Sequence, residues 1–241
     1  MRNPSKIRYF IADIHLSETM PDITSNFTRF LQELPDQCEL YILGDLFDFW
    51  IGNDSQSALH SEVANQIKSL SLRGIDVFFT PGNRDFLLDT PYAKSCNMNI
   101  LPDFYTLNHN QHRILILHGD LLCSYDKSYQ RFRKIMRSSL LKSLFVFVPF
   151  FLRKKIANYI RTRSTNQNSK KAEYKMDISQ ETVEQLLLKY NVDILIQGHT
   201  HKPGQYHFKL NGKEVERMVL GAWHDRGDYV VAADSIKLLA Q

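Results

Sequence analysis

The fold is decided where a short apolar run meets a cluster of acids, in Tyr41-Ile42-Leu43-Gly44-Asp45-Leu46-Phe47-Asp48. The apolar run is typical of a buried β-strand, and residues 40–43 are the predicted strand. Four other predicted strands, at residues 7–12, 77–80, 114–117 and 194–196, also run directly into polar clusters. Those clusters are Asp13-Ile14-His15, Gly82-Asn83-Arg84-Asp85, His118-Gly119-Asp120 and Gly198-His199-Thr200-His201. Because ligands gather at the carboxyl ends of strands in open α/β sheets, we expect the five clusters to converge on one site.

Helical patterns lie between these strands. Residues 23–34, 59–72 and 179–190 carry apolar side chains at helical spacing. The alternation of strands and helices predicts an α/β fold with helices outside a layered sheet. Residues 205–239 alternate like antiparallel strands, and Leu210-Asn211-Gly212-Lys213 is a predicted hairpin turn.

The composition is that of a globular protein. Apolar residues make up 43% and charged residues 23% of the 241 residues. Three cysteines without metal-site spacing argue against a disulfide framework and for a reducing compartment. The first apolar stretch, Tyr9–Ala12, is cut short by Asp13, so no secretory signal is expected, and no run reaches transmembrane length. We therefore expect a cytosolic protein or one held at a membrane surface.

Residues 124–174 break the alternation and are predicted to form an inserted helical cap on a core of residues 1–123 and 175–241. Between Lys127 and Lys175 there are 14 Lys or Arg residues and one acid, Glu173, a balance of +13, whereas the rest of the chain has a balance of −9. This block predicts an anionic partner, either a phosphate, a nucleic acid or a lipid headgroup; a solvated basic helix face is the alternative. Ten of the thirteen residues from Leu140 to Leu152 are apolar. Such a run can cover acyl chains or enter a membrane interface, or it can be an ordinary buried helix pair.

Carboxylates and imidazoles dominate the clusters after the strands. In Asp13-x-His15 and His199-x-His201 the two side chains are expected on the same side of an extended backbone. This mixture suits Mn²⁺, Fe²⁺ or Zn²⁺ better than Ca²⁺, and the absence of cysteine argues against a structural zinc site. Asp45 is the best candidate for a carboxylate that bridges two ions about 3.5–4 Å apart.

The order D-x-H, GDxxD, GN, H and GHxH, from Asp13 to His201, resembles the signature of the calcineurin-like metallophosphoesterases. The resemblance implies a sandwich of two mixed β-sheets flanked by helices, with two divalent ions, for which Mn²⁺ is expected. It implies that one ion is held by Asp13, His15, Asp45 and His201, and the second by Asp45, Asn83, His118 and His199. A water between the ions would attack phosphorus, with its pKa lowered by them.

Arg84 departs from that family's usual GN-H-[DE] pattern, in which the histidine protonates the leaving oxygen. Arginine cannot release a proton usefully at neutral pH, but it offers phosphate a fork of donors. A phosphate leaving group needs no protonation, so Arg84 favours cleavage of a diphosphate. A plain salt bridge from Arg84 to Asp85 is the alternative.

Longer strings resemble the branch of the family that hydrolyses UDP-2,3-diacylglucosamine in lipid A biosynthesis: residues 41–47, 82–88, 118–126, 148–154 and 219–224. The resemblance implies attack on the α-phosphate, giving UMP and 2,3-diacylglucosamine 1-phosphate, by a monomer on the cytoplasmic face of the inner membrane that binds no nucleic acid. It implies catalytic roles for Asn83, Arg84 and His118, and substrate contacts from Asn83, Arg84, Asp126, Ser164, Asn168, Lys171 and His199.

Three questions stay open from the sequence. Trp223 is either a core side chain or a substrate contact, and the role of His224 is equally undecided. A nuclease or cyclic-nucleotide phosphodiesterase of the same superfamily would use the basic block for a nucleic acid. A binding module with a degraded metal site is the third possibility, although all seven expected ligands are present.

Overall fold

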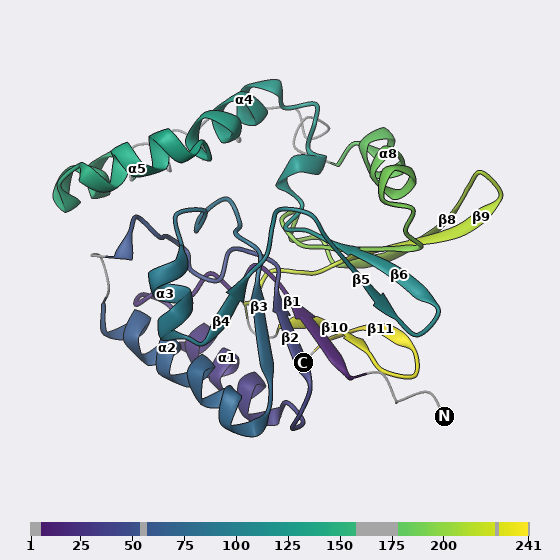
Figure 1. Cartoon of the computed structure of the whole chain (residues 1–241), viewed down its shortest axis with the longest axis horizontal. Coiled ribbons are helices and arrows are strands. Elements are labelled where there is room, and N and C mark those ends of the chain that lie inside the picture. Colours follow the sequence, from purple (N-terminus) through teal and green to yellow (C-terminus); the bar gives the residue numbers. More distant parts are fainter. Residues whose placement is uncertain (1–5, 54–56, 158–177, 225–226, 241) are drawn as a thin grey trace.

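The structure, a computed structural model, describes residues 6–53, 57–157, 178–224 and 227–240. Its strands form two sheets (Figure 1). The first has the order β11-β10-β1-β2-β3-β4 and comprises β1 (Arg8–Ile11), β2 (Glu39–Ile42), β3 (Asp76–Phe79), β4 (Met98–Ile100), β10 (Asp228–Ala232) and β11 (Ile236–Ala240). The second has the order β5-β6-β7-β9-β8 and comprises β5 (Tyr105–His109), β6 (His112–Ile116), β7 (Ile194–Gln197), β8 (Gly204–Leu210) and β9 (Lys213–Val219).

Both sheets are mixed, which confirms the predicted architecture. Strands β1 to β4 pair in parallel, as do β6, β7 and β9, whereas the remaining pairs are antiparallel. The carboxyl ends of the central strands therefore meet at one end of the sandwich, where the polar clusters begin.

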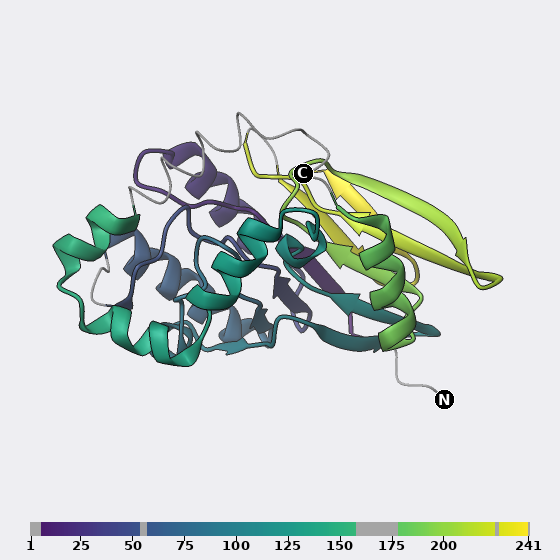
Figure 2. The same cartoon turned by 90° about the horizontal axis from the view of Figure 1, so that it is seen from above.

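Helices cover the outer faces of the two sheets (Figures 1 and 2). Helices α1 (Pro21–Glu33), α2 (Ala58–Leu70) and α3 (Thr90–Ser95) share a hydrophobic core with the first sheet, and α8 (Gln180–Tyr190) shares one with the second. A third core lies between the sheets. In β6 and the residue after it, Ile114 and Ile116 face the inner core while Leu115 and Leu117 face α8. Burial on both faces explains why these strands read as continuous apolar runs.

The five predicted buried strands and three predicted helices are confirmed to within a few residues. The C-terminal hairpin is also confirmed, because Asn211 and Gly212 between β8 and β9 have φ angles of 51° and 79°, as a two-residue turn of this kind requires. The sequence did not predict α3, β4 or β5. Strand β4 has three residues, and β5 carries polar side chains at alternate positions, so neither shows a continuous apolar run.

Residues 127–157 form what we call the helical arm, which extends over the loops at the end of the first sheet (Figure 1). It consists of α4 (Lys127–Met136), α5 (Ser139–Phe147) and the helical residues 150–157. The break at residues 148–149 contains Pro149, which cannot continue a helix. The buried Arg153 ties this end of the arm to the core, since its Nη1 donates to Ile51 O at 2.5 Å. The boundaries of the predicted insertion at 124 and 174 stay a prediction, because residues 158–177 lie outside the described residues.

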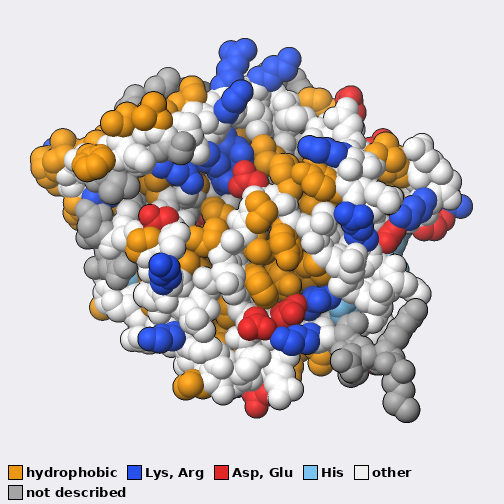
Figure 3. All heavy atoms as spheres, viewed as in Figure 1, with side chains coloured by type: hydrophobic (Ala, Val, Ile, Leu, Met, Phe, Trp, Pro, Cys, Tyr) orange, Lys and Arg blue, Asp and Glu red, His pale blue; other side chains and the backbone are white. Residues whose placement is uncertain are grey.

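The outer side of the arm is apolar. Leu140, Phe147 and Phe151 are 70%, 85% and 60% exposed. Figure 3 shows hydrophobic side chains gathered along the arm at the upper left, with Lys and Arg side chains beside them. These exposures are incompatible with an ordinary buried helix pair. In the part of the chain that is described, no helix is both long and apolar enough to cross a membrane.

Candidate metal centre

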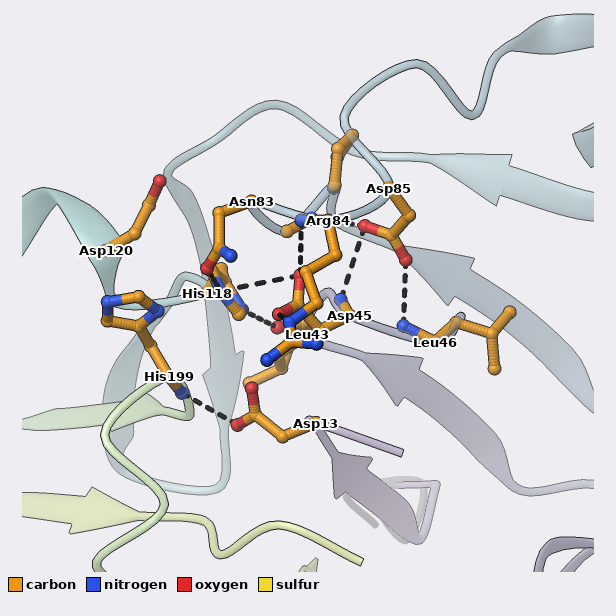
Figure 4. Close-up of polar contacts among 12 residues, drawn as sticks. Asp13, Leu43, Asp45, Leu46, Asn83, Arg84, Asp85, His118, Asp120 and His199 are labelled. Atoms are coloured by element: carbon orange, nitrogen blue, oxygen red, sulfur yellow. Dashed lines mark hydrogen bonds and ion pairs between the residues drawn. The ribbon is translucent and has the colours of Figure 1, made fainter. Parts of the chain in front are cut away.

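The five polar clusters meet where the loops after β1, β2 and β3 face the loops after β6 and β7 (Figure 4). Backbone bonds join neighbouring loops within each sheet: Asp13 N donates to Gly44 O at 3.1 Å, and Gly198 N donates to His118 O at 2.9 Å. Across the two sheets, His199 N donates to Asp13 Oδ2 at 2.7 Å. This last bond joins residues that are 186 positions apart in the sequence.

One group of ligand candidates comprises Asp13, His15 and His201. The Nε2 atoms of His15 and His201 lie 3.2 Å apart, and Asp13 Oδ1 lies 3.5 Å from His201 Nε2 and 4.0 Å from His15 Nε2. Asp13 Oδ1 is buried and has no hydrogen-bond partner among the described residues. A buried carboxylate oxygen without a partner is costly. A divalent cation held between these atoms would remove that cost, so this group fits a metal ion.

A second group comprises Asp13, Asp45 and His118, with Asn83 beside it. His118 Nδ1 lies 2.9 Å from Leu43 O, so this nitrogen carries the proton and donates to the carbonyl. In the neutral ring Nε2 presents a lone pair 2.9 Å from Asn83 Oδ1, which is also an acceptor, whereas the protonated ring, which the neighbouring carboxylates favour when no cation is bound, would donate to that oxygen. Two acceptors facing each other fit a shared cation, and a backbone carbonyl behind the histidine is the usual support for a metal ligand.

Asp45 belongs to the second group and also lies near His15 of the first. Its Oδ1 lies 3.8 Å from His118 Nε2, and its Oδ2 lies 4.0 Å from His15 Nδ1. The two oxygens of Asp45 therefore lie near His118 and His15, while Asp13 is the residue that the two groups share. The ring of His199 lies beside that of His118, with centroids 5.0 Å apart, and belongs to neither group.

The backbone of the ligand candidates differs from what we expected. Asp13, His15, Asp45, His199 and His201 have φ angles of 53°, 56°, 53°, 73° and 56°. The prediction of an extended backbone for Asp-x-His and His-x-His is therefore wrong. These residues occupy the left-handed region of φ and ψ, which residues other than glycine rarely adopt. The loops turn tightly at these residues, and they still bring the ligand atoms of Asp13, His15 and His201 close together. Strained backbone of this kind clusters at functional sites.

Two glycines allow the loops after β2 and β3 to touch. A Cβ added to Gly44, whose φ is 85°, would lie 2.6 Å from Gly82 Cα. A Cβ added to Gly82 would lie 2.1 Å from Asp45 Oδ1. Any larger residue at position 82 would therefore displace the carboxylate of Asp45.

Burial controls the charge of the site. It lowers the pKa of His15 to about 3 and that of His199 to about 4, so both rings are neutral at pH 7, the form that binds metal. Burial also raises the pKa of Asp45 to about 7. For His118, burial lowers the pKa, but the carboxylates of Asp45 and Asp13 outweigh it and raise the pKa overall. A bound cation would offset the free-energy cost of keeping these buried carboxylates charged, and it would lower the pKa of Asp45 so that the group stays ionised.

The alternative of a salt bridge between Arg84 and Asp85 is wrong. Asp85 is fully buried and accepts backbone N–H bonds instead, from Gly82 at 2.8 Å, Asp45 at 3.3 Å and Leu46 at 2.8 Å. The guanidinium of Arg84 pairs with Asp48 and lies 3.7 Å from Asp45 Oδ2. The side chain of Arg84 is 34% exposed, so its fork remains accessible at the rim of the site.

The other residues that the sequence proposed as substrate contacts lie in different surroundings. Asp126 caps α4: its Oδ1 accepts from Tyr129 N at 3.0 Å and from the Ser128 hydroxyl at 2.6 Å. Trp223 belongs to the core, packed edge-on against Phe27 and Phe30, and its backbone N–H supports Asp13 O at 3.1 Å. His224 is exposed. The predicted contacts Ser164, Asn168 and Lys171 lie outside the described residues.

Sequence reasoning missed three residues near the site. Asp120, Tyr129 and Arg133 form a connected group, in which Tyr129 Oη donates to Asp120 Oδ2 at 2.8 Å and Arg133 Nε does so at 2.6 Å. The Tyr129 ring also lies parallel to the ring of His199. Asp120 belongs to the string that includes His118, but the sequence contains no signal that pairs it with a helix ten residues later.

The chain was compared with known proteins. Residues 9–203 match the calcineurin-like phosphoesterase family. The chain is 48% identical over 233 residues to UDP-2,3-diacylglucosamine hydrolase of Edwardsiella ictaluri (strain 93-146), a match that covers 95% of this chain and 90% of that protein. It is 44% identical to the proteins of the same name from Proteus mirabilis (strain HI4320) and Photorhabdus laumondii, with 95% and 96% of this chain and 97% of each relative covered. The chain therefore belongs to the calcineurin-like phosphoesterase family, together with these hydrolases.

Proposed function

We propose that this protein hydrolyses UDP-2,3-diacylglucosamine by attack of water on the α-phosphate, giving UMP and 2,3-diacylglucosamine 1-phosphate for lipid A biosynthesis. The observation that carries the proposal is the site itself: two groups of ligand candidates share Asp13, and Asp45 of the second group also lies near His15 of the first, with Arg84 in the position of the family's usual histidine. The relatives that match 95% of this chain carry the name of the same activity.

Two divalent ions fit the donors that the site offers, and we propose Mn²⁺. Asp13, His15, Asp45 and His201 would hold one ion, and Asp45, Asn83, His118 and His199 the other. When bound, the ions would lower the pKa of the attacking water and neutralise the charge of the phosphate. The hydrogen bond from His118 to Leu43 O keeps the ring in the tautomer whose Nε2 is free to bind.

Arg84 would bind the diphosphate. Its backbone N–H donates to Asp45 Oδ1 at 2.9 Å, which fixes the start of the side chain, while its guanidinium pairs with Asp48 at the surface. The planar fork matches two phosphate oxygens and stabilises charge that develops in the transition state. Because the leaving group is a phosphate, the absence of a histidine acid at this position costs little.

The helical arm would receive the lipid. Its exposed apolar side chains, among them Leu140, Phe147 and Phe151, offer acyl chains an apolar surface. Exposed basic side chains on the same arm, such as Lys154 and Lys155, suit an anionic membrane. We therefore place the protein at the cytoplasmic face of the inner membrane, bound at the surface.

Identification of the products tests this function. The purified protein with Mn²⁺ should convert UDP-2,3-diacylglucosamine to UMP and the lipid phosphate, as seen by mass spectrometry. A chelator should abolish turnover, and Mn²⁺ should restore it. Faster hydrolysis of cyclic AMP or DNA than of the lipid substrate would contradict the proposal.

A further inference from the structure

An arginine at the end of α4 holds the backbone of the loop that follows β3. Arg137 is the residue after the last turn of α4, and its side chain is only 11% exposed. Its Nη2 donates to Gly82 O at 2.6 Å and to Pro81 O at 3.0 Å. These carbonyls lie 55 and 56 positions away in the sequence, so the contact joins the helical arm to the core.

Two acids hold this arginine in place. Asp103 pairs with Arg137 Nη1 through its Oδ1 and with Arg133 Nη2 through its Oδ2 at 2.9 Å. Asp120 accepts from Arg133 Nε at 2.6 Å and lies 3.8 Å from Arg137 Nη2. Two carboxylates therefore face two guanidinium groups, and mutual pairing of this kind is what allows charged groups to be buried.

The peptide group that Arg137 binds leads directly into the metal centre. Gly82 O and the N–H of Asn83 belong to one planar unit, so a bond to the oxygen also fixes the orientation of the next residue. Asn83 Oδ1 lies 2.9 Å from His118 Nε2, and Arg84 N donates to Asp45 Oδ1 at 2.9 Å. A small rotation of this peptide would move both side chains.

We propose that Arg137 is a positioning residue that ties the helical arm to the loop carrying Asn83 and Arg84, so that the lipid-facing arm and the phosphate-facing loop move as one unit. The inference rests on the proposed function for its link to the lipid. Arginine suits the task because its planar fork reaches a carboxylate and two carbonyls at once, which the single ammonium group of lysine cannot do.

The test compares Arg137→Ala with a matched arginine far from the site. Arg73 also binds a carboxylate and two carbonyls, although it is more exposed than Arg137: its Nε pairs with Asp36 at 2.8 Å, and its two terminal nitrogens donate to Leu31 O at 3.0 Å and to Leu34 O. Both variants should lower the melting temperature. Only Arg137→Ala should lower kcat and weaken Mn²⁺ binding in a calorimetric titration, each by about 10- to 100-fold, as for other residues that support metal ligands.

Two further variants exclude a simple loss of folding. Arg137→Lys keeps the charge and should restore the melting temperature better than it restores kcat. In an Arg84→Ala background, Arg137→Ala should lower kcat by a smaller factor than in the wild-type protein, because the part of its effect that passes through Arg84 is already lost and only the part through Asn83 remains.

Three results would overturn the inference. These are equal effects of Arg73→Ala and Arg137→Ala on kcat, undiminished loss in the Arg84→Ala background, and unchanged Mn²⁺ affinity in Arg137→Ala. If the wild-type protein does not hydrolyse UDP-2,3-diacylglucosamine, the proposed function fails, and the Mn²⁺ titration still decides the role of Arg137.

Discussion

Asp13, His15, Asp45, His199 and His201 are half of the ten non-glycine residues with positive φ that the structure describes. The other half are one glutamine and four asparagines, at turns where such conformations are common. Five ligand candidates held in an uncommon conformation indicate that the surrounding structure fixes them in advance of any ion. At the residue scale the site is therefore built by the backbone as much as by the choice of side chain.

The position of Asp45 near both His118 and His15 leads to a prediction about metal content. Asp45→Ala should lose both ions, because its Oδ1 lies near His118 and its Oδ2 lies near His15. His201→Ala should weaken the binding of only the ion held with Asp13 and His15. Elemental analysis after dialysis against Mn²⁺ measures the stoichiometry. Two ions retained in Asp45→Ala would refute the bridging role.

Arg84 should contribute to rate without contributing to stability. Its guanidinium is partly exposed and pairs with Asp48, and such pairs stabilise folding little. Arg84→Ala should therefore lower kcat/KM by about 10²- to 10³-fold, the typical effect of losing one preorganised donor. Arg84→Lys should recover little of that loss, because a point charge does not replace a planar fork.

Asp48→Asn is the control for this prediction, since it removes the charge of the partner and keeps Arg84 in place. Steady-state kinetics on the three variants should show that Asp48→Asn retains most of the activity. If Arg84→Ala and Asp48→Asn are equally mild, Arg84 serves only as half of a surface salt bridge.

At the scale of elements, the strands that are buried on both faces could be predicted from the sequence. The shorter and more polar strands could not. Strands β2, β6 and β7 read as apolar runs because both of their faces lie in a core. The short β4 and the polar β5 carry no such run. The helical arm was recognised by its break with the pattern, although the exposure of its apolar side could be learned only from the structure.

The exposed apolar side chains of the arm predict a substrate-dependent defect. Phe147 and Phe151 are mostly exposed, so replacing both with serine should leave the melting temperature nearly unchanged. Hydrolysis of the diacylated substrate should fall strongly, because acyl chains lose their apolar surface. Hydrolysis of a soluble phosphodiester analogue should be preserved, as steady-state assays on both substrates would show.

Phe145 on the same helix is the matched control, because it packs against the core of the first sheet. Phe145→Ser should lower the melting temperature and reduce activity on both substrates. Equal losses on both substrates with a lowered melting temperature in the Phe147/Phe151 variant would instead show that these side chains stabilise the fold and do not receive acyl chains.

At the scale of the molecule, the described part of the basic block, up to residue 157, has basic side chains of two kinds. Arg133 and Arg137 turn inward to pair with acids of the core, whereas Lys134, Lys154 and Lys155 are exposed. The charge count alone could not separate these roles, because it does not show which side of each helix faces the core. The exposed part is the part available to an anionic surface.

Binding to lipid vesicles should follow this division. The protein should co-sediment with vesicles that contain anionic lipid and release as salt rises, because each basic residue near such a surface contributes about 1 kcal/mol and salt screens it. Lys154→Glu with Lys155→Glu should weaken binding, whereas Lys68→Glu with Lys237→Glu, exposed on other elements, should not. Equal weakening by both pairs would mean that net charge alone governs association.

The composition of the candidate site was largely predictable, since its residues follow strands whose order and direction the sequence indicates. Its precise support was not. The sequence offered Asp85 only as an alternative partner of Arg84, whereas Asp85 binds three backbone N–H groups. Arg137 reaches across the chain to carbonyls that have no sequence signature. Contacts between a side chain and a distant backbone group leave no pattern, because every residue presents the same carbonyl.

Hydrolysis in ¹⁸O-labelled water tests the central claim most directly, because it reports which phosphorus the water attacks. Attack at the α-phosphate predicts that one labelled oxygen appears in UMP and none in 2,3-diacylglucosamine 1-phosphate, as measured by mass spectrometry of both products. Label in the lipid phosphate would show attack at the other phosphorus and would contradict the proposed mechanism.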